Sequence, residues 1–312
     1  MNREAWDLLI TNSKQGNFYA LSWYLDIVSP GWFALVEGLH KEYQIGIPLP
    51  VVKKWGIKIL KQPLFCQQLG IYSTNPLTKT RADEIIKIIK TKYNYILKYS
   101  FNSQNFTELH EAALTENSNI VLSLDRSYEL IRANYKRDRR YRVSQTGKSE
   151  IQMGEDRNIE ELVRMFRENG EKKIYGGVSD SAYDLLRRIY READARGMAT
   201  LIYAKIPTGN IIAGALFIRF RNRITYLFNA AYSEFVKLNG RTLILDSVIR
   251  QFENESLMLD FESPGIKNIE NFYRSFGSYN EVYLSISQNR LPWPIKKIQA
   301  IRRKLLWRRH EG

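Results

Sequence analysis

The stretch LMLDFESPGIKNIENFYRSFG occupies residues 257–277 and predicts a short strand followed by a helix. Residues 257–261 are mostly apolar, which is typical of a buried strand. A helix is predicted over residues 265–276 and ends at a glycine. Asp260 therefore lies near the end of the strand, and Tyr273 lies in the helix.

The segments before this unit also alternate between strands and helices. Runs of apolar and β-branched residues are separated by turn residues, and helical spacing then follows. We predict three strands at 199–206, 211–220 and 224–229, a helix at 240–252, and a last strand at 279–285. Two further helices are predicted at 158–169 and 179–197.

The first half of the chain repeats this order of elements. We predict strands at 31–36, 43–52, 58–60 and 64–72, then a helix at 80–92 and a strand at 95–101. In this helix the apolar stripe consists of Ile85, Ile86, Ile88 and Ile89. Because strand, strand, strand, helix, strand occurs once in each half, we infer duplication of one fold. The predicted class is α/β (α+β), with mixed, mostly antiparallel sheets flanked by helices.

The length of the chain supports two domains. At 312 residues it exceeds what one hydrophobic core usually supports. A helical pattern rich in arginine lies between the halves and ends at Gly147. We therefore expect an N-terminal domain at 1–126, a basic connecting helix at 127–150, a C-terminal domain at 151–290 and a basic tail at 291–312.

Composition indicates a globular and strongly basic chain. Hydrophobic residues make up 44% of it, which excludes a disordered protein. The formal net charge of +14 favours a polyanionic partner, whether nucleic acid, an anionic membrane surface or a phosphate-rich cofactor. Much of this charge lies in two clusters: Arg132, Lys136, Arg137, Arg139, Arg140 and Arg142, and Lys296, Lys297, Arg302, Arg303, Lys304, Arg308 and Arg309.

Cysteine and histidine usage argues against two kinds of site. Cys66 is the single cysteine, so an intramolecular disulfide is impossible, which fits a reducing cytoplasm. His40, His110 and His310 lie far apart and lack partners at metal-ligand spacing, so we predict no metal. The N-terminus has mixed charge and no long apolar run follows it, which predicts a cytoplasmic protein without a signal peptide or membrane span.

A place for phosphate is predicted between the strand at 224–229 and the helix at 240–252. Exposed backbone N–H groups and a helix N-terminus both favour negative charge, and Gly240 would permit close approach. The expected binding residues are Asn229, Ala230, Leu238, Asn239, Gly240 and Arg241. An ordinary loop that contains a glycine is the alternative.

The helix around Tyr273 resembles the last helix of the GNAT superfamily of acetyltransferases. That helix typically has a tyrosine four residues before the glycine that ends it, as Tyr273 stands before Gly277. Residues 237–242 correspond in order to the pyrophosphate loop of the family, although Lys237 and Thr242 depart from its usual residues. The resemblance implies a GNAT fold and acyl-CoA as the co-substrate.

The first half looks like a bacterial group of uncharacterised GNAT proteins related to FemAB and to BioF2-like acyltransferases. The similar segments lie in a fixed order at residues 19–26, 30–32, 48–50, 62–63 and 67–70. With the helix around Tyr273, the likeness covers most of residues 1–290. It implies two tandem GNAT-like domains, with the donor in the second and the acceptor in a cleft between them.

The resemblance also implies a mechanism in which an amine or hydroxyl attacks an activated acyl carbonyl. Such a reaction needs a base, an oxyanion donor and an acid. We assign Tyr273 as the acid and Asp260 or Glu262 as the base. The oxyanion donor would be a backbone N–H near Asn229 or Ala230. A core position for Tyr273 and a capping role for Asp260 are the alternatives.

The acceptor side is expected in the first half of the chain. Gln67 and Gln68 lie in the segment predicted as a strand over 64–72. Because alternate strand residues face opposite sides, at most one of them is expected to line the acceptor cleft.

The tail has the pattern of a basic amphipathic helix. Its apolar side consists of Ile295, Ile298, Ile301, Leu305 and Leu306. Such a helix packs on its own domain, lies on anionic lipid or touches RNA, and the sequence leaves the three open. Peripheral membrane association through this tail is therefore one of the expectations.

Three functions follow from the sequence. The first is transfer of an acyl group from acyl-CoA to a small-molecule or lipid-linked amine or hydroxyl. The second is a FemAB-like transfer from aminoacyl-tRNA to a cell-wall precursor. The third is a non-catalytic protein of the same fold that binds RNA or a membrane surface. The charge of +14 suits tRNA and a lipid-linked acceptor equally.

Overall fold

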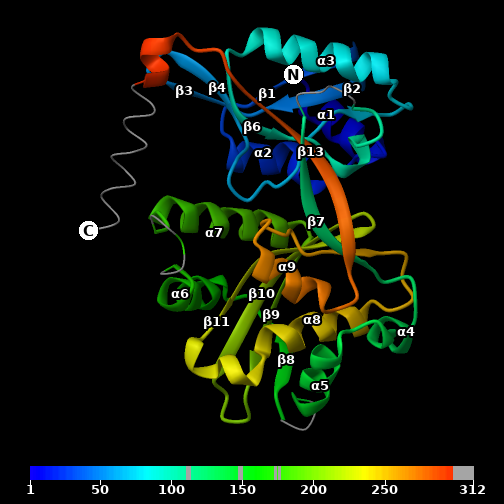
Figure 1. Cartoon of the computed structure of the whole chain (residues 1–312), viewed down its shortest axis with the longest axis vertical. Coiled ribbons are helices and arrows are strands. Elements are labelled where there is room, and N and C mark those ends of the chain that lie inside the picture. Colours follow the sequence, from blue (N-terminus) through cyan, green and yellow to red (C-terminus); the bar gives the residue numbers. More distant parts are fainter. Residues whose placement is uncertain (110–113, 147–149, 172–173, 175–176, 298–312) are drawn as a thin grey trace. The chain divides into compact units, whose positions relative to one another are not determined.

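The computed structural model describes residues 1–109, 114–146, 150–171, 174 and 177–297, and the chain divides into two compact units (Figure 1). Unit 1 consists of Met1–Glu116 and Tyr283–Gly312, and unit 2 is Asn117–Val282. Two strands, β7 (Thr115–Ser123) and β13 (Tyr279–Asn289), pass from one unit to the other. Helices and mixed sheets occur in both units, so the predicted α/β class is confirmed.

Unit 1 contains strands of two sheets, three α-helices before residue 100 and a further helical stretch at residues 293–297. Strands β1 (Phe33–Leu39), β2 (Glu42–Leu49) and β5 (Tyr72–Ser73) form an antiparallel sheet in the order β1-β2-β5. Strands β3 (Val51–Lys54), β4 (Ile57–Lys61) and β6 (Tyr95–Ser100) pair in that order, and β6 pairs with the end of β13. The helices are α1 (Arg3–Asn12), α2 (Ser22–Val28) and α3 (Lys79–Lys92), with 3-10 turns at Phe18–Ala20 and Ser103–Asn105.

Unit 2 is built on a mixed sheet with the strand order β7-β12-β11-β10-β9-β8. The new strands are β8 (Gln152–Glu155), β9 (Ala199–Lys205), β10 (Ile211–Phe220), β11 (Arg223–Ala231) and β12 (Met258–Asp260). Only β11 and β12 pair in parallel among the pairs of this sheet that the structure describes. The helices are α4 (Tyr128–Ala133), α5 (Arg137–Thr146), α6 (Ile159–Asn169), α7 (Asp180–Ala195), α8 (Gly240–Gln251) and α9 (Lys267–Arg274).

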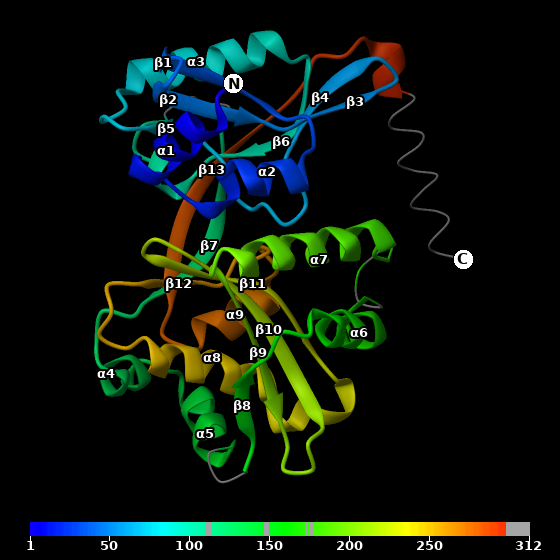
Figure 2. The same ribbon diagram turned by 180° about the vertical axis from the view of Figure 1, so that it is seen from behind.

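Helices cover both faces of the sheet in unit 2 (Figure 2). A Cβ atom on Gly240 of α8 would lie 2.7 Å from the Cβ of Ala213, whereas a Cβ on Gly214 would lie 3.1 Å from Leu162 of α6. Because neighbouring strand residues face opposite sides, α8 and α6 pack on opposite faces of β10. Ala213 and Ala215 belong to the same core cluster as buried residues of α8. The two helices thus cover opposite faces of β10, and residues 212–218 of that strand are buried.

The segment expected as a strand over 64–72 is wrong for most of its length. Only Tyr72–Ser73 forms a strand, and the residues before it are irregular. Their backbone N–H groups are satisfied elsewhere: Gly70 N donates to the hydroxyl of Tyr99 and Ile71 N to Oδ1 of Asn105. Gly70 also has φ +141°, which interrupts an extended chain.

The basic segment at 127–148 forms two helices, α4 and α5, and both lie inside unit 2. Asn134 caps the end of α4, and the N–H of Lys136 donates to the carbonyl of Ser275. The boundaries between the two units lie between residues 116 and 117 and between residues 282 and 283. The N-terminal domain predicted from the sequence ends at 126, and the predicted C-terminal domain begins at 151. Most of the basic tail, residues 298–312, lies outside the described residues.

Several elements were not expected from the sequence. Helices α1 and α2 and strands β7 and β8 all lie in segments without a predicted element. In α1, Trp6 and Leu9 pack so closely on β2 that a Cβ on Gly46 would lie 2.7 Å from each of them. The Trp6 indole N–H also donates to the carbonyl of Ala20 at 2.7 Å. These contacts fix α1 by tertiary packing.

We predict that Gly214→Ala lowers the free energy of unfolding of the protein by about 1–3 kcal/mol, because its methyl group would overlap the buried Tyr203 ring and approach Leu162. The measurement is denaturant unfolding followed by circular dichroism. Gly154→Ala is the control, since a Cβ there meets no atom within 4 Å. If the two variants had the same free energy of unfolding, the close packing of Tyr203 and of Leu162 from α6 on Gly214 would be contradicted.

Candidate functional site

The parallel strands of unit 2 separate in the middle of β11. Pairing with β12 covers only Arg223–Thr225, opposite Met258–Asp260. Strand β11 continues to Ala231 alongside β10, whereas β12 ends at Asp260. One edge of residues 226–231 therefore has no strand partner in the part of the chain that the structure describes. Such an edge can bind an extended chain that contains amide groups.

The N-terminus of α8 lies just beyond this edge. A 3-10 segment, Ser233–Leu238, follows β11, and Asn239 adopts a left-handed conformation (φ 54°) before α8 begins at Gly240. The first N–H groups of a helix have no partner within the helix and attract anions. The structure therefore brings together Leu238, Asn239, Gly240 and Arg241, and places Asn229 and Ala230 on the neighbouring strand.

Gly240 has a packing function that the sequence did not reveal. A side chain there would strike Ala213 and approach Ile212 at 3.1 Å. The missing side chain lets the first turn of α8 lie directly on β10. This close packing holds the helix N-terminus beside the end of β11.

Tyr273 lies on α9 and is 6% exposed. Its ring stacks on Phe261 with centroids 4.7 Å apart and meets Tyr226 edge-on at 6.2 Å. Burial raises the pKa of the Tyr273 hydroxyl well above its ordinary value, Arg241 opposes this shift and Glu262 adds to it. The phenol therefore stays protonated at neutral pH, as a proton donor must.

The hydroxyl of Tyr226 is a second polar atom in this region. It is buried and has no hydrogen-bond partner among the described residues. Buried polar groups are normally satisfied, so an unpaired one near Tyr273 and Arg241 is consistent with a place where a ligand completes the site. Sequence reasoning did not single out Tyr226.

Asp260 is 2% exposed and belongs to an ion-pair network. Arg223 donates to its Oδ2 at 2.6 Å and to Glu281 at 2.7 Å, and the amide of Asn119 donates to its Oδ1 at 2.8 Å. Burial lowers the pKa of Arg223, but the carboxylates of Asp260 and Glu281 raise it more, so the net shift is upward. These contacts occupy the Asp260 carboxylate, which is a poor arrangement for a base.

Glu262 is more accessible than Asp260. It is partly exposed, and its backbone has φ 46°, which side-chain-bearing residues adopt rarely and at a cost. Two hydrogen bonds hold this loop: Glu262 N donates to Oδ1 of Asp260 at 2.8 Å, and Ser263 N donates to Oδ1 of Asn119 at 2.9 Å. Asp260 thus positions the loop that carries Glu262.

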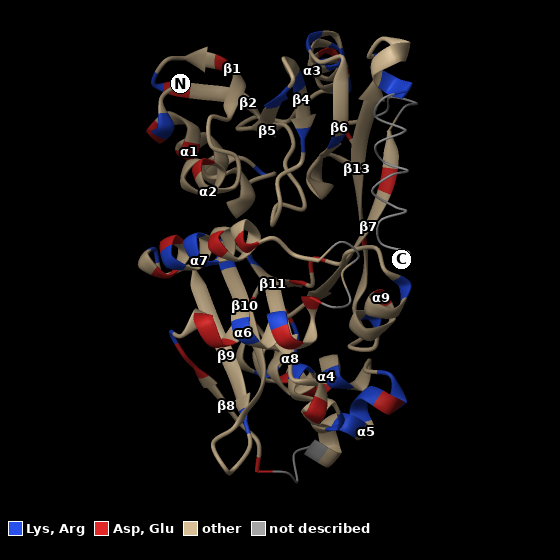
Figure 3. Cartoon of the chain, turned by 90° about the vertical axis from the view of Figure 1, so that its left-hand side faces the viewer, with Lys and Arg blue, Asp and Glu red and all other residues tan. Residues whose placement is uncertain are grey.

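Arg139 differs from its basic neighbours on α5, where Figure 3 shows several basic residues. It is 6% exposed, whereas Arg137 and Arg142 are exposed. Its Nε donates to Oγ of Ser275 at 2.8 Å, and its Nη1 donates to the hydroxyl of Thr242. Burial lowers the pKa of Arg139 to about 10. Arg139 therefore ties α5 to α8 and α9.

Gln67 and Gln68 lie in unit 1, in the irregular segment before β5. Gln68 is 4% exposed, and its Oε1 accepts from the N–H of Ser103 at 2.9 Å. Its Nε2 donates to Oε1 of the partly exposed Gln67 at 3.0 Å. Since neither residue is on a strand, the alternation argument does not apply to them, and their role at an acceptor stays a prediction.

The described residues contain no cluster of possible metal ligands and no helix that could span a membrane. No group of three or more His, Cys, Asp or Glu side chains is placed to hold a metal ion in that part of the chain. Within the same residues, no helix combines the length and apolar character needed to cross a bilayer. His110 and His310 lie outside them.

A known family model matches part of unit 2. Residues 131–266 match the family described as "Acetyltransferase (GNAT) domain". This range contains the end of α4, all of α5 to α8, and strands β8 to β12. No curated protein sequence matches the chain.

Solved structures match along almost the whole chain. The crystal structure of FemX has a TM-score of 0.67 at 13% identity and covers 96% of this chain and 98% of its own. The C-terminal domain of a putative lysylphosphatidylglycerol synthetase from Agrobacterium fabrum has a TM-score of 0.54 at 8% identity, with 92% of each chain covered. The chain therefore has the fold of FemX, and the GNAT-like fold predicted from the sequence is confirmed.

We predict that Asp260→Asn lowers the free energy of unfolding of the protein by about 3 kcal/mol, because it leaves one arm of the partly buried Arg223 guanidinium without its charged partner. Denaturant unfolding tests this. The control is Glu255→Gln, which removes a pair with Arg219 in which both side chains are about half exposed. If Asp260→Asn lowered the free energy of unfolding no more than the control does, the structural role of Asp260 would be contradicted.

Proposed function

We propose that the protein transfers an acyl group from acyl-CoA to an amine or hydroxyl acceptor, with the donor bound in unit 2. The observation that carries this proposal is the separation of β11 from β12 beside Tyr273 and the N-terminus of α8. An extended amide chain and an anionic group are the two parts of such a donor. The free strand edge suits the first and the helix N-terminus suits the second.

The residues around this edge support assigned roles in acyl transfer. Attack of the acceptor on the thioester carbonyl forms a new C–N or C–O bond and breaks the C–S bond. A backbone N–H near Asn229 or Ala230 would stabilise the negative charge that develops on the carbonyl oxygen. Tyr273, kept protonated by its burial, would donate a proton to the departing thiolate.

Glu262 is the better candidate for the base. It is partly exposed, and its charge contributes to the pKa shift of Tyr273, so the two side chains interact. Asp260 is instead buried in the ion pair with Arg223. We therefore assign proton removal from the acceptor to Glu262 and positioning of its loop to Asp260.

A second candidate function uses aminoacyl-tRNA as the donor. The observation in its favour is the fold likeness to FemX over 98% of that protein, because FemAB-like enzymes use this donor. The chemistry at the acyl carbonyl would be similar, since an ester is again attacked by an amine. The two candidates differ in the leaving group, a thiolate or a ribose oxygen, and in the size of the donor.

We predict that Tyr273→Phe lowers kcat by about 10²–10³-fold and leaves the affinity for acetyl-CoA nearly unchanged, because only the transition state needs its proton. Thiol release from acetyl-CoA with a panel of amines and alcohols measures the rate. Tyr279→Phe is the control, since that tyrosine is 48% exposed on β13. Unchanged turnover in Tyr273→Phe would refute the assigned acid.

We also predict that calorimetric titration with acetyl-CoA gives micromolar binding that persists at moderate salt, and that Arg241→Glu weakens it about tenfold by opposing the anionic groups at the helix N-terminus. Arg191→Glu serves as the control, because Arg191 is exposed on α7. If the unaltered protein binds no acyl-CoA but binds aminoacyl-tRNA, the second candidate replaces the first.

A further inference from the structure

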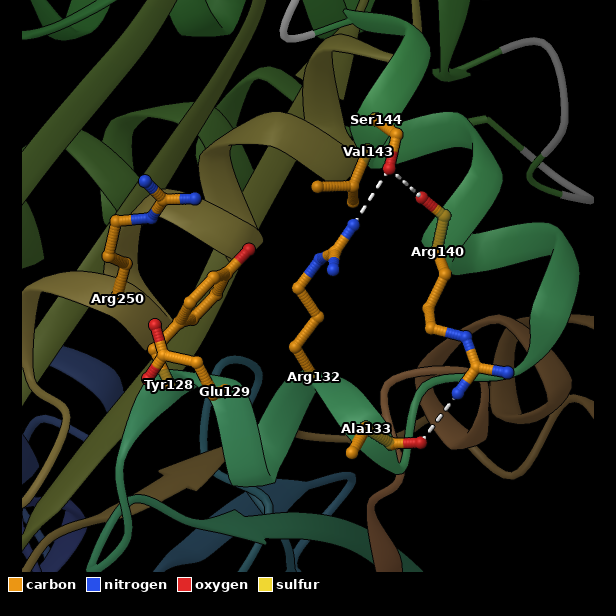
Figure 4. Close-up of a pocket in the computed structure, with 8 residues that line it drawn as sticks. All are labelled: Tyr128, Glu129, Arg132, Ala133, Arg140, Val143, Ser144 and Arg250. Atoms are coloured by element: carbon orange, nitrogen blue, oxygen red, sulfur yellow. Dashed lines mark hydrogen bonds between the residues drawn. The ribbon is translucent and has the colours of Figure 1, made fainter.

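A pocket of about 440 Å³ lies among α4, α5 and the C-terminal half of α8 in unit 2 (Figure 4). Three arginines line it, Arg132 from α4, Arg140 from α5 and Arg250 from α8, with Glu129 as the only carboxylate among the lining residues that the structure describes. The pocket is separate from the proposed donor site. Ten residues of α8 separate Gly240 from Arg250, which corresponds to about 15 Å along the helix.

The arginines are held by neutral groups. Arg132 donates to Oγ of Ser144 at 2.7 Å, and Arg140 donates to the carbonyl of Ala133 at 2.6 Å. The guanidinium of Arg250 lies 4.3 Å from the centroid of the Tyr128 ring. Within the described residues, none of the three arginines forms an ion pair with a carboxylate. The carboxylate of Asp246 acts electrostatically on Arg250 and Arg132, and that of Glu129 acts on Arg250, but no direct ion pair in the described part of the chain occupies the three guanidinium groups.

The walls of the pocket are fixed by a buried carboxylate beneath them. Asp246 of α8 is 6% exposed and accepts hydrogen bonds at 3.0 Å from the hydroxyls of Tyr128 and Tyr135. The N–H of Tyr128 also donates to the carboxylate of Glu253 at 2.6 Å. These bonds anchor α4 on α8, so the side chains of Arg132 and Arg250 are presented from a rigid frame.

We propose that this pocket binds the phosphomonoester group of a ligand other than the acyl donor. Guanidinium groups match the geometry of phosphate oxygens, and the three of them outnumber the two carboxylates, Glu129 and Asp246, that act on them. A concave pocket of this volume suits a terminal phosphate that enters it. The backbone of an extended RNA would instead follow an open basic surface.

The probes are inorganic phosphate and a sugar phosphate. Each is titrated by calorimetry into the full chain at low and moderate salt. The expected result is binding by the unaltered protein and at least a tenfold loss of affinity in Arg132→Gln. Arg140→Gln provides the same test if Arg132→Gln does not fold. Arg188→Gln, on the exposed side of α7, is the control and should bind as the unaltered protein does.

Further variants separate this pocket from the donor site. Ala133→Glu adds a carboxylate to the pocket lining and should weaken phosphate binding, whereas Arg241→Glu at the donor site should not. The pocket variants should also leave acetyl-CoA binding unchanged, so failure of the proposed function and failure of this proposal are distinguishable. Phosphate binding that is lost in Arg241→Glu but kept in Arg132→Gln would overturn the proposal. Binding of an RNA oligonucleotide without binding of either phosphate probe would overturn it too.

Discussion

The ion pair between Arg223 and Asp260 is the interaction on which the site in unit 2 depends. Arg223 begins β11 opposite Met258, and Asp260 ends β12 opposite Thr225, so the ion pair joins the two strands across the whole of their short paired segment. Glu281 from β13 and Asn119 from β7 complete the network. Buried charges are costly unless they are paired and hydrogen-bonded, and here each has several partners. The network therefore fixes the point of strand separation and the backbone of the loop at Glu262.

Helix α8 connects the two proposed sites of unit 2. Its first turn lies on β10 because Gly240 has no side chain, and Arg139 holds Thr242 from the other side. Its middle carries Asp246, which binds two tyrosine hydroxyls and orients α4. The N-terminus of the helix thus lies at the proposed donor site, while Arg250 near its other end contributes to the arginine pocket. One rigid helix can therefore position groups about 15 Å apart.

The high positive charge has more than one structural role. Arg139 is buried, and its guanidinium lies over the rings of Phe272 and Phe276 and donates a hydrogen bond to Ser275. This charged group therefore helps to hold α5 against α9. Arg132 and Arg140 lie in a pocket without a carboxylate partner among the described residues. A net charge of +14 predicts an anionic partner in general, but it does not tell which cations are available to bind it.

The sequence by itself determined the order of most strands and helices, because side-chain periodicity is a local property that adjacent residues carry. It also predicted the fold through the resemblance of the helix around Tyr273 and Gly277 to the last helix of the GNAT superfamily, and the likeness to FemX confirms that fold. Only the tertiary structure showed that Asp260 pairs with Arg223, that Arg139 is buried and that Gln68 lies in an irregular segment. Those features depend on partners far away in the chain, and burial and ion pairing exist only once the strands and helices have packed together.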